Sequence, residues 1–255
     1  MKRPSILLTL TLAGLSASAW AAPPPPEEVA RRALENTLFA ANDARATLEL
    51  EISKEGKVVR KRALSAMIKR EASRSRTYVE FHSPADVAGT RFLSVDDGET
   101  KQFIYLPAFK KVKRIVGAQR TQSFVGTDFS YADLEGRDAS EWAWRGLPDA
   151  VVKGESTWVV EGTTNKADAP YTRMRLWVHP QHGIPLVTEL YAAGSDQAAK
   201  RLTVEKLAKK DSRWVVVDSI MATPASATTT RLIVTALDTT TPIPDEALTK
   251  EALER

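Results

Sequence analysis

The sequence predicts a mainly β protein with a few helices (α+β), built as an antiparallel barrel or sandwich. Apolar and polar residues alternate along many short segments, which is the pattern of strands with one buried face. Turn-forming residues separate these segments at near-regular intervals, as in antiparallel barrels and sandwiches. The 255 residues allow one or two domains, and we find no internal repeat.

The N-terminus carries the features of a secretory signal peptide. Two basic residues precede an apolar run at 6–15, and small residues favour cleavage before Ala22. We therefore expect a signal peptide at 1–21 and one mature domain at 22–255, soluble in the periplasm. No later segment approaches the roughly 20 apolar residues of a spanning helix. The sequence has no cysteine, which excludes a lipid-modified cysteine and disulfide chemistry.

The first elements after the proline run are a helix and a meander of strands. Residues 27–41 place aliphatic side chains at helical spacing behind acidic residues, which predicts a helix. Residues 44–53 alternate strictly between apolar and polar side chains, which predicts a half-buried strand. Looser alternation predicts two more strands, at 58–70 and at 74–82.

The central stretch continues this meander with a hairpin. Strands are expected at 89–95 and 100–106, because the turn residues Asp96-Asp97-Gly98 between them are a strong hairpin signal. The segment 126–134 predicts a loop that enters a helical turn, with Asp128 or Ser130 as its N-cap. Its flanking glycines permit a second interpretation, a mobile lid over the mouth of the barrel.

The second half of the chain predicts further short strands, with Pro/Gly, Gly-Ser-Asp and Lys-Lys-Asp turns between several of them. The expected strands are 158–161, 171–179, 184–191, 200–207, 213–221 and 228–237. A short helix is expected at 244–255, entered through Pro244 and two acidic residues.

The stretch from 83 to 136 also carries a long ordered set of motif residues. These are Pro84, Gly89-Thr90, Phe92-Leu93, Tyr105-Leu106-Pro107, Lys111-Val112-Lys113-Arg114-Ile115, Ser123-Phe124, Gly126-Thr127-Asp128-Phe129-Ser130-Tyr131 and Asp133-Leu134. This set resembles the LolA-like family of outer-membrane lipoprotein-sorting proteins, in the branch found beside RND-type exporters. A weaker likeness extends over most of the mature chain. The resemblance implies a half-open antiparallel β-barrel capped by helices, with an apolar cavity for acyl chains.

Two groups of residues are the candidate ligand contacts. The aromatic and aliphatic group is expected to line the apolar cavity or, alternatively, to fill an ordinary core; it comprises Phe92, Leu93, Phe103, Ile104, Tyr105, Leu106, Phe109, Phe124, Phe129, Tyr131 and Trp177. Trp177 is expected on the cavity rim or on the outer surface. The basic group is either a solvated loop or a contact to anionic head groups or a membrane partner; it comprises Lys110, Lys111, Lys113 and Arg114.

Catalysis and cofactor binding find little support in the sequence. The three histidines are His82, His179 and His182, and the last two lie on a Pro/Gly turn without a nearby acidic or cysteine ligand. We find no nucleophile elbow, phosphate-binding glycine loop or zinc-protease motif. We therefore expect no catalytic residue, no metal and no cofactor. A secreted location also makes nucleic acid an implausible partner.

These observations favour a periplasmic carrier or chaperone that binds acyl chains of lipids or lipoproteins and ferries them toward the outer membrane. The resemblance implies an inner-membrane RND-type exporter as donor and an outer-membrane acceptor. We expect the carrier to act as a monomer. The alternative is a lipid-sensing or adaptor module of the same fold, which regulates a protein partner in the cell envelope.

Overall fold

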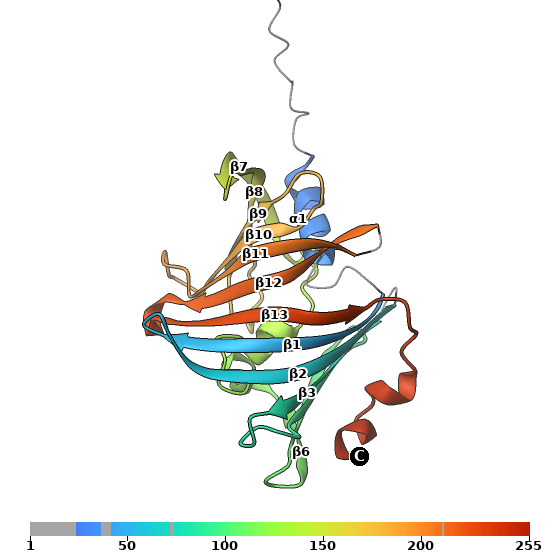
Figure 1. Cartoon of the computed structure of the whole chain (residues 1–255). Helices are drawn as coiled ribbons and strands as arrows, with labels where there is room; N and C mark the ends of the chain where they lie inside the picture. Colours follow the sequence, from blue (N-terminus) through green and yellow to red (C-terminus); the bar gives the residue numbers. More distant parts are fainter. Residues whose placement is uncertain (1–23, 37–41, 72–73, 211) are drawn as a thin grey trace, which may run out of the picture.

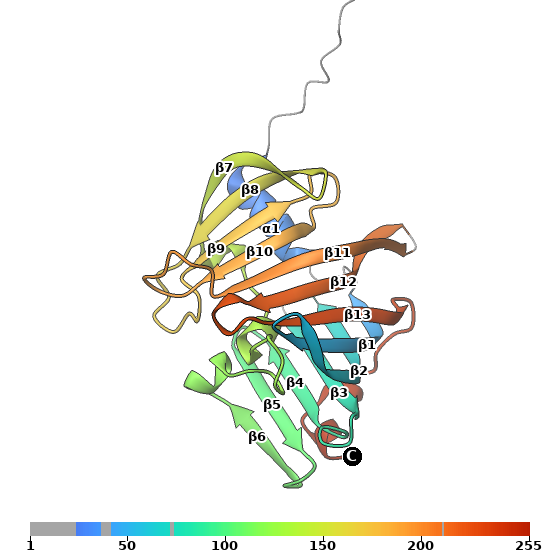
Figure 2. The same ribbon diagram turned by 60° about the vertical axis from the view of Figure 1, so that its left-hand side comes forward.

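A computed structural model of the chain describes residues 24–36, 42–71, 74–210 and 212–255. Within these residues, thirteen antiparallel strands form one open, curved sheet, and one α-helix lies against it (Figures 1 and 2). The prediction of a mainly β, half-open barrel is therefore confirmed. The predicted signal peptide lies outside the described residues, which begin at Pro24.

The elements follow one another in a simple order along the chain. The helix α1 (Pro26–Glu35) precedes thirteen strands. The strands are β1 (Asp43–Lys54), β2 (Lys57–Glu71), β3 (Arg74–Ser83), β4 (Arg91–Asp96), β5 (Thr100–Leu106), β6 (Lys111–Ile115), β7 (Ala143–Val152), β8 (Glu155–Thr163), β9 (Arg173–Val178), β10 (Pro185–Tyr191), β11 (Lys200–Lys210), β12 (Arg213–Thr223) and β13 (Thr228–Asp238). The 3-10 helices are η1 (Gly117–Thr121), η2 (Tyr131–Leu134), η3 (Ala139–Glu141), η4 (Pro224–Ser226), η5 (Asp245–Leu248) and η6 (Glu251–Glu254).

The sheet consists of two meanders that share its centre. Strands β1 to β6 run outward in order on one side, β13 to β7 run outward on the other, and β1 pairs with β13 between them. The two open edges are therefore β6 and β7, which are consecutive in the chain. The segment that joins them, residues 116–142, has to cross one face of the sheet (Figure 2). We call this face the inner face and residues 116–142 the covering segment.

Alternation along the strands separates the inner face from the outer face. In β1, Leu48, Leu50 and Ile52 are buried on the inner face, whereas the intervening Glu49 is exposed. Apolar residues of β2, β3, β4 and β5 continue this buried row, and Phe124 and Tyr131 of the covering segment pack onto it. The predicted strand pattern of residues 44–53 is confirmed.

The helix α1 covers the other half of the inner face. Pro26 occupies the first turn together with Glu27 and Glu28, a sequence that favours a helix start. Val29, Ala30 and Ala33 are buried against β7 to β10. The sequence predicts a helix up to residue 41; the helix ends at Glu35, and residues 37–41 lie outside the described part of the chain.

The structure corrects three expectations about secondary structure. The basic group is not a loop, because Lys111, Lys113 and Arg114 lie on the edge strand β6, and only Lys110 lies in the preceding turn. Residues 143–152, for which the sequence predicts no strand, form β7. The C-terminal residues form two 3-10 helices in place of one helix. The hairpin at Asp96-Asp97-Gly98 is confirmed, and Gly98 adopts φ of +100° there.

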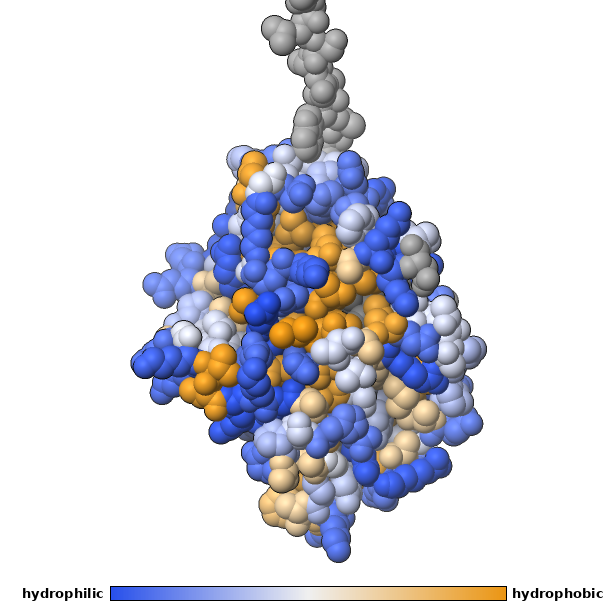
Figure 3. All heavy atoms as spheres, viewed as in Figure 1, coloured by the Kyte–Doolittle hydropathy of each residue, from blue (hydrophilic) through white to orange (hydrophobic). Residues whose placement is uncertain are grey.

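The C-terminal residues pack on the outer face beneath β2 to β6. Ile243, Leu248 and Leu253 are buried against outer-facing side chains such as Leu93. Asp245 accepts hydrogen bonds from two basic residues of β2 and β3, which fixes the start of η5. Hydrophobic side chains also gather over the middle strands of the face seen in Figure 3. Among the described residues, no helix has the length and apolar character needed to cross a membrane.

Candidate functional site

The inner face is the candidate site, because its apolar side chains are buried by two separate covers. One cover is α1 and the other is the covering segment (Figure 2). Each cover buries a separate apolar cluster. The cluster under the covering segment is centred on Phe81, Phe92 and Phe124, and the cluster under α1 is centred on Met174 and Leu176.

Six of the predicted cavity residues meet in the cluster under the covering segment. Phe92, Phe124 and Tyr131 form mutual ring contacts, with centroids between 5.1 and 5.9 Å apart. Ile104 is buried in the same cluster. The remaining two, Leu106 and Phe129, are partly buried against it. In this arrangement the six predicted residues pack as a core.

The other predicted cavity residues lie elsewhere. Leu93, Phe103 and Tyr105 are on the outer face, under the C-terminal residues. Phe109 is 62% exposed in the turn between β5 and β6. The prediction grouped consecutive residues of one strand, whereas successive side chains of a strand point to opposite faces.

Trp177 lies on the outer surface, the second of the two positions considered. Its strand neighbours Leu176 and Val178 are buried in the cluster under α1, so Trp177 points to the opposite face. There the guanidinium groups of Arg175 and Arg201 each lie 5.8 Å from the centre of its ring. Trp177 is therefore stacked among arginines and away from both covers.

The basic group is exposed along the edge of the sheet. Lys113 places its Nζ 5.0 Å from the centre of the Phe109 ring, and Arg114 lies 3.5 Å from Glu99. Lys110 adopts φ of 48° in the hairpin turn. The hairpin of β5 and β6 thus presents an aromatic ring and several cations side by side.

Polar contacts fasten the covering segment to the sheet. The Thr230 hydroxyl donates to the Asp128 carboxylate at 2.7 Å, and the Asp128 amide donates to the Thr230 oxygen at 2.9 Å. Gln102 of β5 donates to the Tyr131 carbonyl at 2.8 Å. The two residues considered as N-cap have different roles. Ser130 is the N-cap of η2, whereas Asp128 binds Thr230 of β13.

A buried ion pair holds the same segment from its other side. Lys200 of β11 lies 2.7 Å from Asp133, and Arg137 lies 3.3 Å from the same carboxylate. Burial alone would raise the pKa of Asp133, but the charges of Arg137 and Lys200 outweigh it and lower this pKa below its ordinary value. Burial raises the pKa of the neighbouring Tyr171 hydroxyl, which therefore stays neutral.

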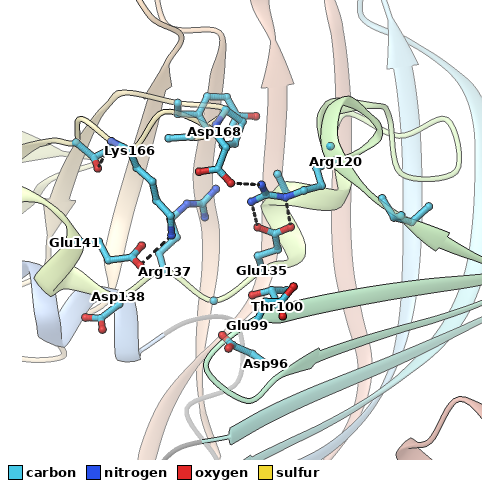
Figure 4. Close-up of a pocket in the computed structure, with 18 of the residues that line it drawn as sticks. Asp96, Glu99, Thr100, Arg120, Glu135, Arg137, Asp138, Glu141, Lys166 and Asp168 are labelled. Atoms are coloured by element: carbon cyan, nitrogen blue, oxygen red, sulfur yellow. Dashed lines mark hydrogen bonds and ion pairs between the residues drawn. The ribbon is translucent and has the colours of Figure 1, made fainter.

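A polar pocket of about 700 Å³ lies between the covering segment, the β4–β5 turn and the β8–β9 loop. Arg120 bridges Glu135 and Asp168, and Lys166 pairs with Glu141 (Figure 4). The two other basic residues that line it also have carboxylate partners. Because its charges are paired with one another, we interpret this pocket as a brace for the covering segment.

An apolar crevice of about 360 Å³ lies at the N-terminal end of α1. Its walls include Val29 of the helix, Leu147 of β7 and Trp158 and Val160 of β8. The sequence alone does not point to these residues, because a crevice between a helix and strands more than 100 residues away leaves no local signal.

In this part of the structure Gly162 also allows the Trp144 ring to lie on the sheet, since a Cβ on Gly162 would be 2.7 Å from the ring.

Comparison with known proteins supports a LolA-like fold. A search of curated protein sequences gave no significant match. Among solved structures, a chain described as a putative outer membrane lipoprotein-sorting protein domain from Vibrio parahaemolyticus is 25% identical, with a TM-score of 0.82 over 90% of this chain and 98% of that one. A DUF1329 family protein from Desulfovibrio piger is 23% identical, with a TM-score of 0.82 over 90% of this chain and 100% of that one.

A third structure carries the fold name itself. A LolA superfamily protein from Nitrosomonas europaea is 16% identical, with a TM-score of 0.71 over 90% of this chain and 100% of that one. At the level of sequence, a protein-family model described as "Uncharacterized protein" matches residues 73–255. The chain therefore belongs to the family that this description covers, and it has a LolA-like fold.

Proposed function

We propose that this protein is a periplasmic carrier that binds the acyl chains of a lipid or lipoprotein between the inner face and its covers. The observation that carries the proposal is the apolar crevice beside α1. Its volume of about 360 Å³ is within the range of roughly 300–1,000 Å³ typical of small-molecule sites. Its walls are mainly apolar, as an acyl chain requires.

The physical need for such a carrier follows from the cost of exposing hydrocarbon to water. Each methylene group transferred from water into an apolar site contributes about 0.8 kcal/mol of favourable free energy. A long acyl chain therefore cannot cross an aqueous compartment unshielded at a useful rate. Under α1 the guest would contact Val29, Trp158 and Val160 in place of water. Binding of this kind is non-directional, which suits a carrier that has to release its cargo.

We propose that the six predicted cavity residues become part of the acyl site only when the covering segment moves away from the sheet. In the described arrangement they fill the space themselves. The exposed hairpin of β5 and β6 is the proposed contact to anionic head groups or to a membrane partner. Each of its cations near an anionic surface would add about 1 kcal/mol of attraction, and the exposed Phe109 ring adds apolar surface beside them.

The cellular setting is part of the same proposal. We infer that residues 1–21 are removed as a signal peptide and that 22–255 act as one carrier domain in the periplasm. The cargo would pass from an inner-membrane exporter of the RND type to an outer-membrane acceptor. The similarity to a lipoprotein-sorting domain at 25% identity supports a role in lipoprotein or lipid handling, and we propose no catalytic activity.

The test combines a search for native cargo with a variant that fills the crevice. Native mass spectrometry of the protein, purified from periplasm without detergent, is expected to show a bound species of acyl-lipid mass. After delipidation, Gly146→Trp is expected to reduce the uptake of a fluorescent acyl probe at least fivefold. Gly146 pairs in register with Val160 of the inner face, and a Cβ on it would lie 3.6 Å from Cγ of Pro26, so the indole would enter the crevice. Val151→Trp is the matched control, since Val151 lies on the same strand but is 70% exposed.

Two results would contradict the carrier proposal. One is a protein that is empty as purified and takes up no acyl probe after delipidation, which would favour the adaptor module. The other is equal probe uptake by Gly146→Trp and Val151→Trp, which would move the acyl site away from the crevice.

A further inference from the structure

Two arginine side chains on the inner face of β2 form no ion pair with the described residues. Arg60 and Arg62 pair in register with Ile52 and Leu50 of β1, so all four side chains share the inner face. Arg62 is only 4% exposed, and Arg60 is exposed at the end of the sheet. Among the described residues neither guanidinium group forms an ion pair, whereas the intervening Lys61, on the outer face, pairs with Glu51.

The two guanidinium groups converge on one point of the covering segment. A Cβ placed on Gly126 would lie 3.3 Å from Nη2 of Arg62 and 3.6 Å from Nη1 of Arg60. Gly126 and the preceding Val125 both have positive φ, 73° and 50°, so the backbone turns tightly over the arginines. The Val125 carbonyl accepts a hydrogen bond from Nη1 of Arg62. Because Gly126 has no Cβ, the backbone of the covering segment can lie in contact with both cations.

The local electrostatics around these two arginines favour an anion. Within the described part of the chain, the buried Nε of Arg62 has no hydrogen-bond acceptor, and its guanidinium group contacts the Phe81 ring (5.8 Å to the ring centre) in place of a carboxylate. A buried charge that is incompletely paired is unfavourable. Burial, and then the charge of Arg60, lowers the pKa of Arg62, and Asp86 opposes this only in part. Asp128, an acidic residue of the covering segment two positions from Gly126, is occupied by the hydroxyls of Thr228 and Thr230.

We propose that Arg60 and Arg62 bind the phosphate group of an anionic phospholipid whose acyl chains lie against the inner face. Guanidinium groups bind phosphate oxygens in bidentate fashion. This chemistry suits two arginines that lie against the same glycine and have no carboxylate partner among the described residues. Beside Arg60, the β1–β2 hairpin exposes Val58 and Val59 by 51% and 62%. Apolar side chains next to cations match the amphipathic chemistry of a phospholipid better than that of a free anion. This inference rests on the proposed carrier function. Six strands separate β2 from β8, so it assigns the head group of a cargo whose acyl chains lie under the covering segment, the proposed extension of the acyl site.

The test compares three probes by isothermal titration calorimetry on the delipidated mature protein. The probes are inorganic phosphate, monomeric dihexanoyl-phosphatidylglycerol and its uncharged analogue dihexanoylglycerol. We expect phosphatidylglycerol to bind at least tenfold more tightly than the uncharged analogue. Arg60→Gln is expected to abolish this difference while it leaves the affinity for dihexanoylglycerol within twofold, because Arg60 lies outside the crevice beside α1.

Two further variants make the result specific to this site. Lys61→Gln changes the same net charge on the same strand but on the outer face, and it is expected to leave all three affinities unchanged. Arg62→Leu removes the buried cation, and it is expected to abolish the preference for phosphatidylglycerol. If Arg62→Leu does not fold, Arg60→Gln, whose side chain is exposed, decides the question alone.

The outcomes separate this inference from the carrier function. Equal binding of both lipids, or the same loss in Lys61→Gln as in Arg60→Gln, overturns the phosphate site and leaves the carrier intact. Inorganic phosphate binding that depends on Arg60, without binding of either lipid, overturns the lipid assignment and the carrier together and identifies a free-anion site. An absence of binding by all three probes overturns both.

Discussion

The two covers of the inner face are attached to the sheet by different forces. The covering segment is fixed by directional contacts, such as Thr230 to Asp128 at 2.7 Å and Lys200 to Asp133 at 2.7 Å. Helix α1 lies on the sheet mainly through small apolar side chains, and the polar contact at its C-terminal end is the bond from Asn36 to the His182 carbonyl at 3.2 Å.

This difference suggests which cover admits a guest. A directional hydrogen bond or ion pair holds one position, and a buried polar group that loses its partner incurs a penalty of about 1–3 kcal/mol. Apolar contact is non-directional, so a helix held by it can shift while an acyl chain replaces part of the contact. The apolar crevice lies at the edge of α1 and the polar pocket lies at the edge of the covering segment. We therefore expect loading beside α1.

The largest expected effect concerns the ring cluster under the covering segment. Phe92→Ala removes a fully buried ring that contacts Phe124 and Tyr131, and it should lower the free energy of unfolding by about 3–5 kcal/mol. Phe109→Ala, at an exposed ring, should change it by no more than about 0.5 kcal/mol. Denaturant unfolding measures both. A small loss for Phe92→Ala would mean that this cluster is loosely packed and can accept cargo.

A smaller effect is expected at the interface of α1. Ala30 is fully buried between the helix and the sheet, so Ala30→Leu should overpack the contact and lower the free energy of unfolding by about 1–3 kcal/mol. Glu27→Leu, on the exposed side of the same helix, is the control. Hydrogen exchange should show faster exchange in α1 and unchanged exchange in the covering segment. Equal acceleration in both would show that the two covers move as one unit.

The smallest effect is a pH dependence that distinguishes the covers. The pKa of Asp133 is lowered below its ordinary value of 3.8, so this carboxylate stabilises the fold above that pH. The stabilisation is lost progressively as the pH falls below 3.8 and through the lowered folded-state value. Hydrogen exchange of residues 123–134 should therefore accelerate at low pH before that of α1, and Asp133→Asn should abolish the difference. Parallel acceleration in the unmodified protein would contradict the separate attachment.

Much of the fold was predictable from local pattern, because β1 and most later strands alternate cleanly. Two strands, β6 and β7, were not predicted, and each has a physical reason. β6 is an edge strand whose charged side chains resemble a loop, and β7 contains Gly146 and Pro148, which are unusual inside a strand. The C-terminal residues resemble the start of a single helix because Pro244 is followed by two acidic residues, yet they form two 3-10 helices.

The candidate site was less predictable than the fold. The sequence indicated the aromatic residues of the central stretch but could not show that Phe103 and Ile104 serve opposite faces in different clusters. The crevice depends on contacts between α1 and β8 that are distant in sequence. Arg62 did carry a local signal, since it occupies an apolar position in the alternation of β2. Only the structure shows that no described carboxylate pairs with it.

The central claim is that an acyl chain enters beside the N-terminal end of α1, and a reversible clamp tests it most directly. A Cβ on Gly146 would lie 3.6 Å from Cγ of Pro26 and more than 4 Å from its Cβ. This separation is near the upper end of the roughly 3.5–4.5 Å between the Cβ atoms of a disulfide, so we choose Pro26→Cys with Gly146→Cys as the clamp across the mouth of the crevice. The sequence has no other cysteine. A second clamp, Arg32→Cys with Gly183→Cys, joins the other end of α1, where a Cβ on Gly183 would lie 3.4 Å from Cβ of Arg32. Gly183 has φ of +65° and this Cβ would lie 2.9 Å from Nδ2 of Asn36, so the reduced form of the same variant is its reference.

The measurement is the rate of uptake of a fluorescent acyl probe by each oxidised and reduced variant. We expect the clamp at Pro26 and Gly146 to slow uptake at least tenfold when oxidised and to restore it on reduction, while the clamp at Arg32 and Gly183 slows it less. Uptake at the unclamped rate by the oxidised Pro26 and Gly146 variant would show that acyl chains do not enter beside α1.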